Sequence, residues 1–240
     1  MFHSLLYYML DQKIYAFICT RSKALSGITK HYLTYLAKCG IQVKLLVNQE
    51  SIFSGYKKAF TAVNPNPEDI IILSHDDIRI NIPFTSFVPA LSKALDKNTG
   101  FVGVAGTTYL GEDLVWWDQT RWQQGYHRGA VYHAHGYDVD RNPTIYGPPG
   151  QVVCLDGLFL ASRARALEYI DLAKPDYLEG DWDFYDIHYT LAAHIKGYKN
   201  KAINLSAVHF SRGELAGRDS WHKNRKLVYN KYKEELPIKC

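Results

Sequence analysis

The 240-residue sequence lacks the features that define several broad classes of protein. No part of it approaches the ~20 consecutive apolar residues of a membrane-spanning helix. The apolar segment at residues 2–10 has neither a basic leader nor a small-residue cleavage site, so we expect no signal peptide. Internal repeats, low-complexity tracts and linkers are also missing. We therefore expect a single domain over residues 1–240.

Cysteine is scarce, and the cysteines that are present are scattered. The four of them, Cys19, Cys39, Cys154 and Cys240, form no CxxC pair. Their spacing argues against a zinc site and against a disulfide framework. Reduced thiols are typical of the cytoplasm, where we expect the protein to reside, with contact at the inner membrane face left open.

An excess of basic residues occurs only near the C-terminus. The net charge is +4, and residues 218–240 hold seven Lys or Arg against three Asp or Glu. The rest of the chain is formally neutral, so it lacks the basic face that general nucleic-acid binding requires. Residues 219–235 are predicted to form a basic helix that packs Trp221, Val228 and Tyr232 inward. Peripheral contact of this helix with phosphates or an anionic membrane is the alternative.

Strand and helix patterns alternate along the first half of the chain. Strands are predicted at residues 13–19, 43–47, 70–73 and 101–105, with amphipathic helices between them at about 25–39, 53–63 and 87–95. This order predicts an α/β domain of the Rossmann-like, three-layer α/β/α type, with a mostly parallel central sheet covered by helices on both faces. Ligands of such sheets bind beyond the carboxyl ends of the strands.

Residues 106–150 interrupt the alternation. This stretch has little periodicity, contains three prolines and is rich in aromatic residues, so we expect an irregular, functional segment. After it, strand pieces are predicted at 152–155 and 158–161, helices at 163–172 and 184–197, and a strand at 202–210.

Three polar groups of residues could carry chemistry. The first is His75-Asp76-Asp77, which ends a buried strand. Mg²⁺ and Mn²⁺ prefer carboxylate oxygens and often keep substrate phosphates as further ligands. Paired acids at a strand end therefore suggest a metal site completed by a diphosphate, with a simple acidic turn as the structural alternative.

The second group opens the helix near residue 184. Asp181 is the simplest N-cap, and Asp183 and Asp186, three residues apart, are predicted to share a helix face. A carboxylate held there could act as a general base, although acids in a first turn are also favoured by the helix dipole alone. The third group follows a late strand, where His209 could bind a metal and Arg212 a phosphate.

Taken together, these residues resemble the glycosyltransferase family 2-like group, which has the GT-A nucleotide-sugar fold, and in particular its small branch in bacteria and large viruses. His75-Asp76-Asp77 resembles the DxD-type metal motif, with His in place of the first acid. Tyr185-Asp186 resembles the Glu-Asp block, with Tyr in place of Glu. Residues 153–161 are similar to the segment around Leu-Asp-Gly, and residues 208–213 to a late His-x-Ser-x-Gly element.

The resemblance implies a metal-dependent, inverting glycosyltransferase. Such an enzyme moves a hexosyl or deoxyhexosyl group from a nucleoside diphosphate-sugar to a hydroxyl of a saccharide or glycoconjugate. Asp77 and His209 would bind Mn²⁺ or Mg²⁺, and Asp186 would be the catalytic base. The implied donor-binding residues are Thr20, Arg21, Asn48, Asp76, Asp156 and Gly157. The implied acceptor-side residues are Trp116, Trp117, Trp122 and Asp183, the tryptophans as stacking platforms or, alternatively, as packed core.

Two other functions stay open. A metal-dependent nucleotidyltransferase also combines a nucleotide fold with paired acids, but the segment 20–27 is a poor match to a Gly-rich, basic phosphate loop. A non-catalytic glycan-binding domain with the same fold would be expected to lack a key acid, whereas Asp77, Asp156 and Asp186 are all present. A dehydrogenase is disfavoured because no GxGxxG follows the first strand.

Overall fold

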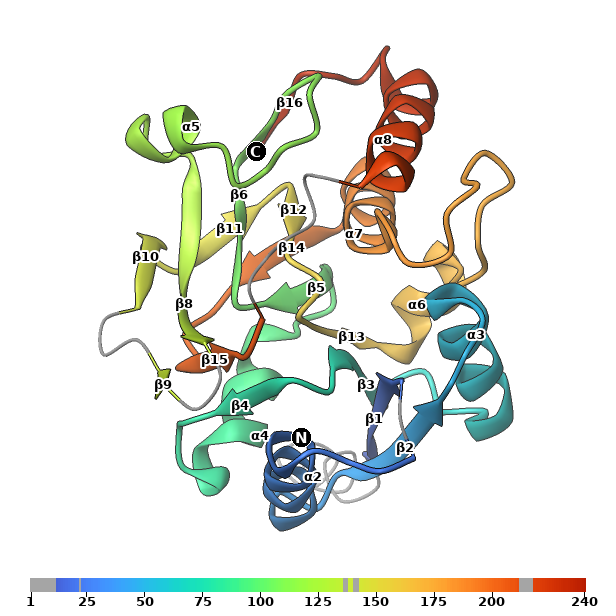
Figure 1. Ribbon diagram of the computed structural model, residues 1–240, viewed down its shortest axis with the longest axis vertical. Helices are drawn as coiled ribbons and strands as arrows, with labels where there is room; N and C mark the ends of the chain where they lie inside the picture. The colour runs from blue at the N-terminus through green and yellow to red at the C-terminus, as the bar shows by residue number, and fades with distance from the viewer. Residues whose placement is uncertain (1–11, 22, 136–137, 140–142, 212–217) are drawn as a thin grey trace, which may run out of the picture.

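The computed structural model describes residues 12–21, 23–135, 138–139, 143–211 and 218–240. The N-terminal segment 2–10 and Arg212, on which two of the sequence predictions rest, lie outside the described residues. One of two seven-stranded sheets runs through the centre of the molecule (Figure 1). Its strands in spatial order are β11 (Gly150–Val152), β14 (Lys199–Ala202), β5 (Thr99–Gly103), β13 (Phe159–Arg163), β3 (Ile70–His75), β1 (Ile14–Thr20) and β2 (Gln42–Val47).

Helices cover both faces of this sheet. Phe159 of β13 contacts Phe87 on one face, whereas Phe101 of β5, which points to the other face, stacks on Tyr189. The first face carries α2 (Gly27–Lys38) and α4 (Phe84–Ala94). The opposite face carries α3 (Ile52–Val63), α6 (Ala164–Ile170) and α7 (Tyr185–Ile195). The predicted α/β class and three-layer arrangement are therefore confirmed.

The central sheet is mostly parallel, as predicted: five of its seven strands run in one direction, and β13 and β11 run in the other. β1 is parallel to β2 and β3, and β5 is parallel to β14. β13, however, runs antiparallel between β3 and β5, and β11 runs antiparallel to β14. β13 enters the central sheet from the second sheet through the short turn at 156–158.

The segment predicted to be irregular, residues 106–150, contains several β-strands. It supplies much of a second sheet, together with the short helix α5 (Gln119–Gln123). Most of its strands have two to four residues, and the nine-residue strand at 127–135 is interrupted at Gly129, which hid the alternation. Gly129 has a φ of +91° and leaves no room for a side chain against the carbonyl of Val104. The strands of this sheet in spatial order are β12 (Cys154–Leu155), β6 (Ala105–Thr107), β8 (His127–His135), β15 (Ala207–His209) and β4 (Ile78–Ile80), with β9 (Asp138–Val139) and β10 (Thr144–Gly147) also paired to β8.

The predicted strand at 202–210 is two strands in two different sheets. β14 ends at Ala202 in the central sheet, and β15 begins at Ala207 in the second sheet. Between them the chain turns at Ser206, which has a φ of +50°. A continuous apolar pattern cannot distinguish one long strand from two short ones that change sheet.

The C-terminal region confirms the predicted helix and adds a small ribbon. α8 (Asp219–Tyr232) buries Trp221, Val228 and Tyr232, as the spacing predicts. β16 (Ile238–Lys239) then pairs with β7 (Tyr109–Leu110). All four cysteines are free thiols. Among the described helices, none combines the length and apolar character needed to span a membrane.

The two sheets meet where several strands pass from one to the other. The chain goes from β3 to β4 through Asp76 and Asp77, and from β12 to β13 through residues 156–158. β15 pairs with β4 so that His209 lies opposite Ile78. These connections bring the polar groups singled out in the sequence to one junction, which we call the sheet junction.

Candidate functional site

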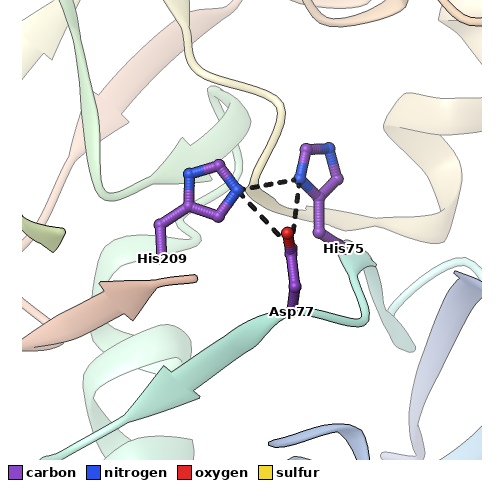
Figure 2. Close-up of side chains that lie close together, drawn as sticks. All are labelled: His75, Asp77 and His209. Carbon is purple, nitrogen blue, oxygen red and sulfur yellow. Dashed lines mark hydrogen bonds and ion pairs between the residues drawn. The ribbon is translucent and has the colours of Figure 1, made fainter. Parts of the chain in front are cut away.

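Three side chains converge at the sheet junction: His75, Asp77 and His209 (Figure 2). Nε2 of His209 lies 3.4 Å from Nδ1 of His75 and 3.5 Å from Oδ1 of Asp77. Nδ1 of His75 lies 3.7 Å from the same carboxylate oxygen. Oδ1 of Asp77 is buried and accepts no hydrogen bond from any described residue. Two imidazole nitrogens and a carboxylate oxygen that face one another are the donor set of a divalent cation site.

Backbone hydrogen bonds hold the three residues in place. The N–H of His75 donates to the carbonyl of Leu158 at 3.1 Å, which ties the end of β3 to the turn before β13. The N–H of Phe210 donates to the carbonyl of Asp77 at 2.8 Å, which ties the end of β15 to the start of β4. These two backbone hydrogen bonds therefore fix the strand ends that carry the three side chains.

Electrostatics favour an ionised carboxylate in this cluster. Burial would raise the pKa of Asp77, but its contact with His209 and the charges of the two imidazoles outweigh burial and lower the pKa. Burial lowers the pKa of His75, although the charge of Asp77 opposes this shift. Burial also acts to lower the pKa of His209, yet Asp77 outweighs it, so the pKa of His209 is raised. Asp77 therefore offers a negative charge at neutral pH.

Tyr185 is a member of the site to which the sequence interpretation gave no role. Its side chain is buried, and its hydroxyl lies 2.8 Å from Nε2 of His75 and 2.8 Å from the carbonyl oxygen of Gly157. Burial raises the pKa of the phenol well above its usual value, so Tyr185 keeps its proton. The only sequence signal was its position beside Asp186 in a motif where the resemblance implies an acid.

Asp186 lies in the first turn of α7. It is linked to His75 of the cluster through Gly157 and Tyr185. Its Oδ2 accepts the N–H of Gly157 at 3.1 Å, and its Oδ1 accepts the N–H of Ile187 at 2.8 Å. Burial, reinforced by the charge of Asp156, raises the pKa of Asp186 to about 7 even though both N–H donors oppose the shift. A carboxyl group that titrates near neutral pH is suited to general-base chemistry.

The turn of Asp156 and Gly157 connects these groups. Oδ1 of Asp156 accepts the N–H of Leu158 at 2.9 Å, which fixes the turn between β12 and β13. A Cβ at Gly157 would collide with the hydroxyl of Tyr185 and lie 2.9 Å from Cβ of Asp186. Only glycine lets the turn approach α7 this closely.

The donor-side residues Thr20, Arg21 and Asn48 line one hollow of about 470 Å³ at the carboxyl ends of β1 and β2. The N–H of Asn48 donates to the carbonyl of Thr20 at 2.9 Å, which joins the ends of β1 and β2. The charge of Asp76 adds to burial in raising the pKa of Cys19, at the end of β1, to about 12. Three residues that the sequence interpretation did not include complete the lining: Gln49, Glu50 and Trp182.

The residues predicted for the acceptor side have different environments. Trp116 is buried among Trp117, His127 and Tyr146, so it is part of the core and offers no face for stacking. Trp117 packs on Trp221 of α8 and is only partly exposed, whereas Trp122 is 38% exposed.

The acids before α7 do not act as predicted from helix geometry. Asp181 is not the N-cap, because the helix begins later and its N-cap is Phe184, with a φ of +62°. Asp181 instead pairs with Lys174 at 3.0 Å. Asp183 lies outside the helix, is buried and has Arg218 at 3.8 Å, so it does not share a helix face with Asp186.

The sequence profile of one protein family, described as "Glycosyltransferase like family", matches residues 17–232. The chain belongs to this family. The match includes every site residue named above, from Thr20 to Arg218. No curated protein matches the sequence.

Several solved structures match this chain at low sequence identity. A197 from STIV is 14% identical, with a TM-score of 0.46 over 83% of this chain and 86% of that one. TarS of S. aureus is 11% identical, with a TM-score of 0.48 over 93% and 72% of the two chains. The 4-diphosphocytidyl-2C-methyl-D-erythritol synthase is 11% identical, with a TM-score of 0.41 over 91% and 99%. The assignment to the family rests on the sequence match.

Proposed function

We propose that this glycosyltransferase-like protein moves a hexosyl or deoxyhexosyl group from a nucleoside diphosphate-sugar to a hydroxyl of a saccharide or glycoconjugate, with inversion. The observation that carries the proposal is a continuous series of contacts at the sheet junction, from His209 and Asp77 through His75, Tyr185 and Gly157 to Asp186. It joins a cation-type cluster to a carboxyl group that titrates near pH 7. Family membership supports the transferase class.

The hollow at the ends of β1 and β2 is the proposed nucleotide site. Parallel strands bind nucleotides beyond their carboxyl ends, and this hollow opens there. Arg21 is exposed and can meet the negative charge of a phosphate, while Asp76 can accept a hydrogen bond from a ribose hydroxyl. Asp156 and Gly157 would then face the sugar, because their turn lies between the cluster and Asp186.

The cluster of His75, Asp77 and His209 fits a divalent cation, because three donor atoms converge and the buried Oδ1 of Asp77 has no hydrogen bond among the described residues. A bound Mn²⁺ or Mg²⁺ would stabilise negative charge on the departing diphosphate as a Lewis acid.

Asp186 is the proposed general base. Its two N–H contacts hold the carboxylate in one orientation, and its raised pKa makes it a better proton acceptor than an ordinary aspartate. Asp186 would take the proton of the acceptor hydroxyl as that oxygen attacks the anomeric carbon from the face opposite the leaving group. Attack from that face inverts the anomeric configuration.

The acceptor is proposed to contact the exposed aromatic surface near α5. Trp122 is the best candidate for stacking on a sugar ring, since it is exposed and its Nε1–H is already used by the carbonyl of Ile145. Trp117 could contribute an edge, whereas Trp116 is too deeply buried.

A panel of nucleoside diphosphate-sugars with Mn²⁺ tests the proposal. Binding of each donor is measured by calorimetry, and hydrolysis or transfer is followed by NMR, which also reports the anomeric configuration of the product. We expect one donor class to bind and to react with inversion. Asp77→Asn should lose the part of the activity that depends on the metal. If no donor binds or reacts, or if Asp77→Asn behaves as the wild type, the proposal is wrong.

A further inference from the structure

The contact between His75 and Tyr185 determines which nitrogen of His75 carries a proton. Tyr185 has one hydroxyl hydrogen and two neighbours at 2.8 Å, Nε2 of His75 and the carbonyl oxygen of Gly157. A carbonyl oxygen can only accept a hydrogen bond. For both contacts to be hydrogen bonds, Tyr185 must donate to Gly157, and Nε2–H of His75 must donate to Tyr185.

The tautomer of His75 follows from this arrangement. A neutral imidazole with its hydrogen on Nε2 has a free lone pair on Nδ1. Nδ1 is the atom that faces the cluster, 3.4 Å from Nε2 of His209 and 3.7 Å from Oδ1 of Asp77. The hydrogen bond to Tyr185 thus leaves the inward nitrogen of His75 available to a cation.

Tyr185 is held rigidly enough to set this orientation. Its ring is buried and makes edge contacts with Phe53, Tyr56 and Tyr189. A partner that hydrogen-bonds the outer nitrogen of a histidine fixes both ring orientation and tautomer in metal sites.

We propose that Tyr185 is a positioning residue that holds His75 as the Nε2–H tautomer, so that His75 is the third protein ligand of the metal. The proposal deepens the proposed function, because it concerns the ligand set of the same site. The proposed ligand set also implies a preference between metal ions. Mg²⁺ strongly favours oxygen ligands, so a site with two imidazoles and one carboxylate selects a transition ion such as Mn²⁺ over Mg²⁺.

NMR of the metal-free wild-type protein tests the tautomer without any mutation. Long-range ¹H–¹⁵N spectra of histidine-labelled protein distinguish a protonated from an unprotonated ring nitrogen, and His75→Gln assigns the signals. We expect Nε2 of His75 to carry the hydrogen at pH 8. A hydrogen on Nδ1 at that pH would overturn the proposal.

Metal affinity of Tyr185→Phe tests the positioning role. The change removes one hydroxyl and keeps the ring, and we expect Mn²⁺ to bind about 10–100-fold more weakly, the usual cost of losing such a partner. Tyr189→Phe is the matched control: it removes a buried hydroxyl from the same helix, one that donates to the carbonyl of Leu172 at 2.8 Å, and should bind Mn²⁺ as the wild type does. Circular dichroism establishes that both variants are folded.

Titrations with Mn²⁺ alone, followed by electron paramagnetic resonance, keep this test separate from sugar transfer. Excess Mg²⁺ should fail to displace Mn²⁺ from the wild-type protein. The proposal is overturned if Tyr185→Phe retains wild-type Mn²⁺ affinity, if Tyr189→Phe loses as much affinity, or if Mg²⁺ competes on equal terms. Because no donor is present, a failed transfer assay leaves these results unaffected, and the reverse also holds.

Discussion

The backbone N–H of Gly157 donates a 3.1 Å hydrogen bond to Oδ2 of Asp186. This bond joins the turn between β12 and β13 to the first turn of α7, across 29 residues of sequence. Together with the 2.8 Å hydrogen bond from the N–H of Ile187, it holds the carboxylate in one orientation. The turn approaches α7 so closely that a side chain at Gly157 would have no space. The position of the proposed base therefore depends on glycine at 157.

Replacing the proposed base should separate catalysis from binding. Asp186→Asn removes the proton acceptor but keeps the size of the side chain, and we expect transfer to fall by about 10²–10⁴-fold while donor affinity is retained. Steady-state kinetics and donor calorimetry on the same preparation measure both quantities. Asp183→Asn, whose acid has Arg218 at 3.8 Å, is the control and should keep most of the activity. Wild-type activity in Asp186→Asn would move the role to Asp156.

The pH dependence of transfer should report the titration of Asp186. Burial and the charge of Asp156 raise its pKa to about 7, so the base is largely protonated at pH 6 and largely ionised at pH 8. We therefore expect kcat to rise with pH through about 7 and then level off. The profile is measured at saturating donor and acceptor concentrations. A rate that is already constant from pH 5 upward would contradict the assignment.

Metal binding should stabilise the folded protein through Asp77. A ligand at about 100 times its Kd adds about 2.7 kcal/mol to the free energy of unfolding, which a thermal melt detects as a rise in Tm. We expect Mn²⁺ to raise the Tm of the wild type and to leave Asp77→Asn unchanged. Asp76→Asn is the neighbouring control: it should keep the Mn²⁺-dependent rise in Tm and bind the nucleotide donor more weakly. An equal rise in Tm for Asp77→Asn would remove this residue from the metal site.

A methyl group at Gly157 should damage both stability and activity. Gly157→Ala makes the turn clash with Tyr185 and Asp186 of α7, and overpacking of this kind costs about 1–3 kcal/mol. Gly27→Ala is the matched control, because a Cβ at the start of α2 meets nothing within 4 Å. Urea denaturation should give a lower midpoint for Gly157→Ala and an unchanged or higher one for Gly27→Ala. Equal midpoints would show that the turn can move away from α7 at little cost.

Substitutions of the tryptophans predicted for the acceptor side should have different effects, because the side chains differ in burial. Trp116 is 2% exposed, so Trp116→Ala creates a cavity and should cost about 3–5 kcal/mol of stability. Trp122 is 38% exposed, so Trp122→Ala should leave the unfolding free energy nearly unchanged and raise the KM for the acceptor. Urea denaturation and acceptor kinetics measure the two effects. An unchanged KM in Trp122→Ala would place the acceptor elsewhere.

The local sequence pattern was sufficient for the elements whose burial is uniform along the chain. The apolar run from Ile70 to Leu73 is fully buried in β3, and the glycines at 40 and 197 have the positive φ of residues that follow a helix. The pattern was insufficient where strands are short. It did not predict the second sheet within residues 106–150, because most of the strands there have only two to four residues and the nine-residue β8 is interrupted at Gly129, so no period can be recognised.

The candidate site divides in a similar way. The sequence by itself determined which residue types stand at the strand ends: His75-Asp76-Asp77, Asp156-Gly157, Asp186 and His209 are all read directly from it. Only the tertiary structure decided that His75 faces His209 across 134 positions, that Tyr185 lies 2.8 Å from His75 across 110, and that Trp116 is core. The reason is physical: periodicity along a chain reports the local burial of each element. Which residues meet where the two sheets join is set by long-range packing, and such packing leaves no periodic pattern in the local sequence.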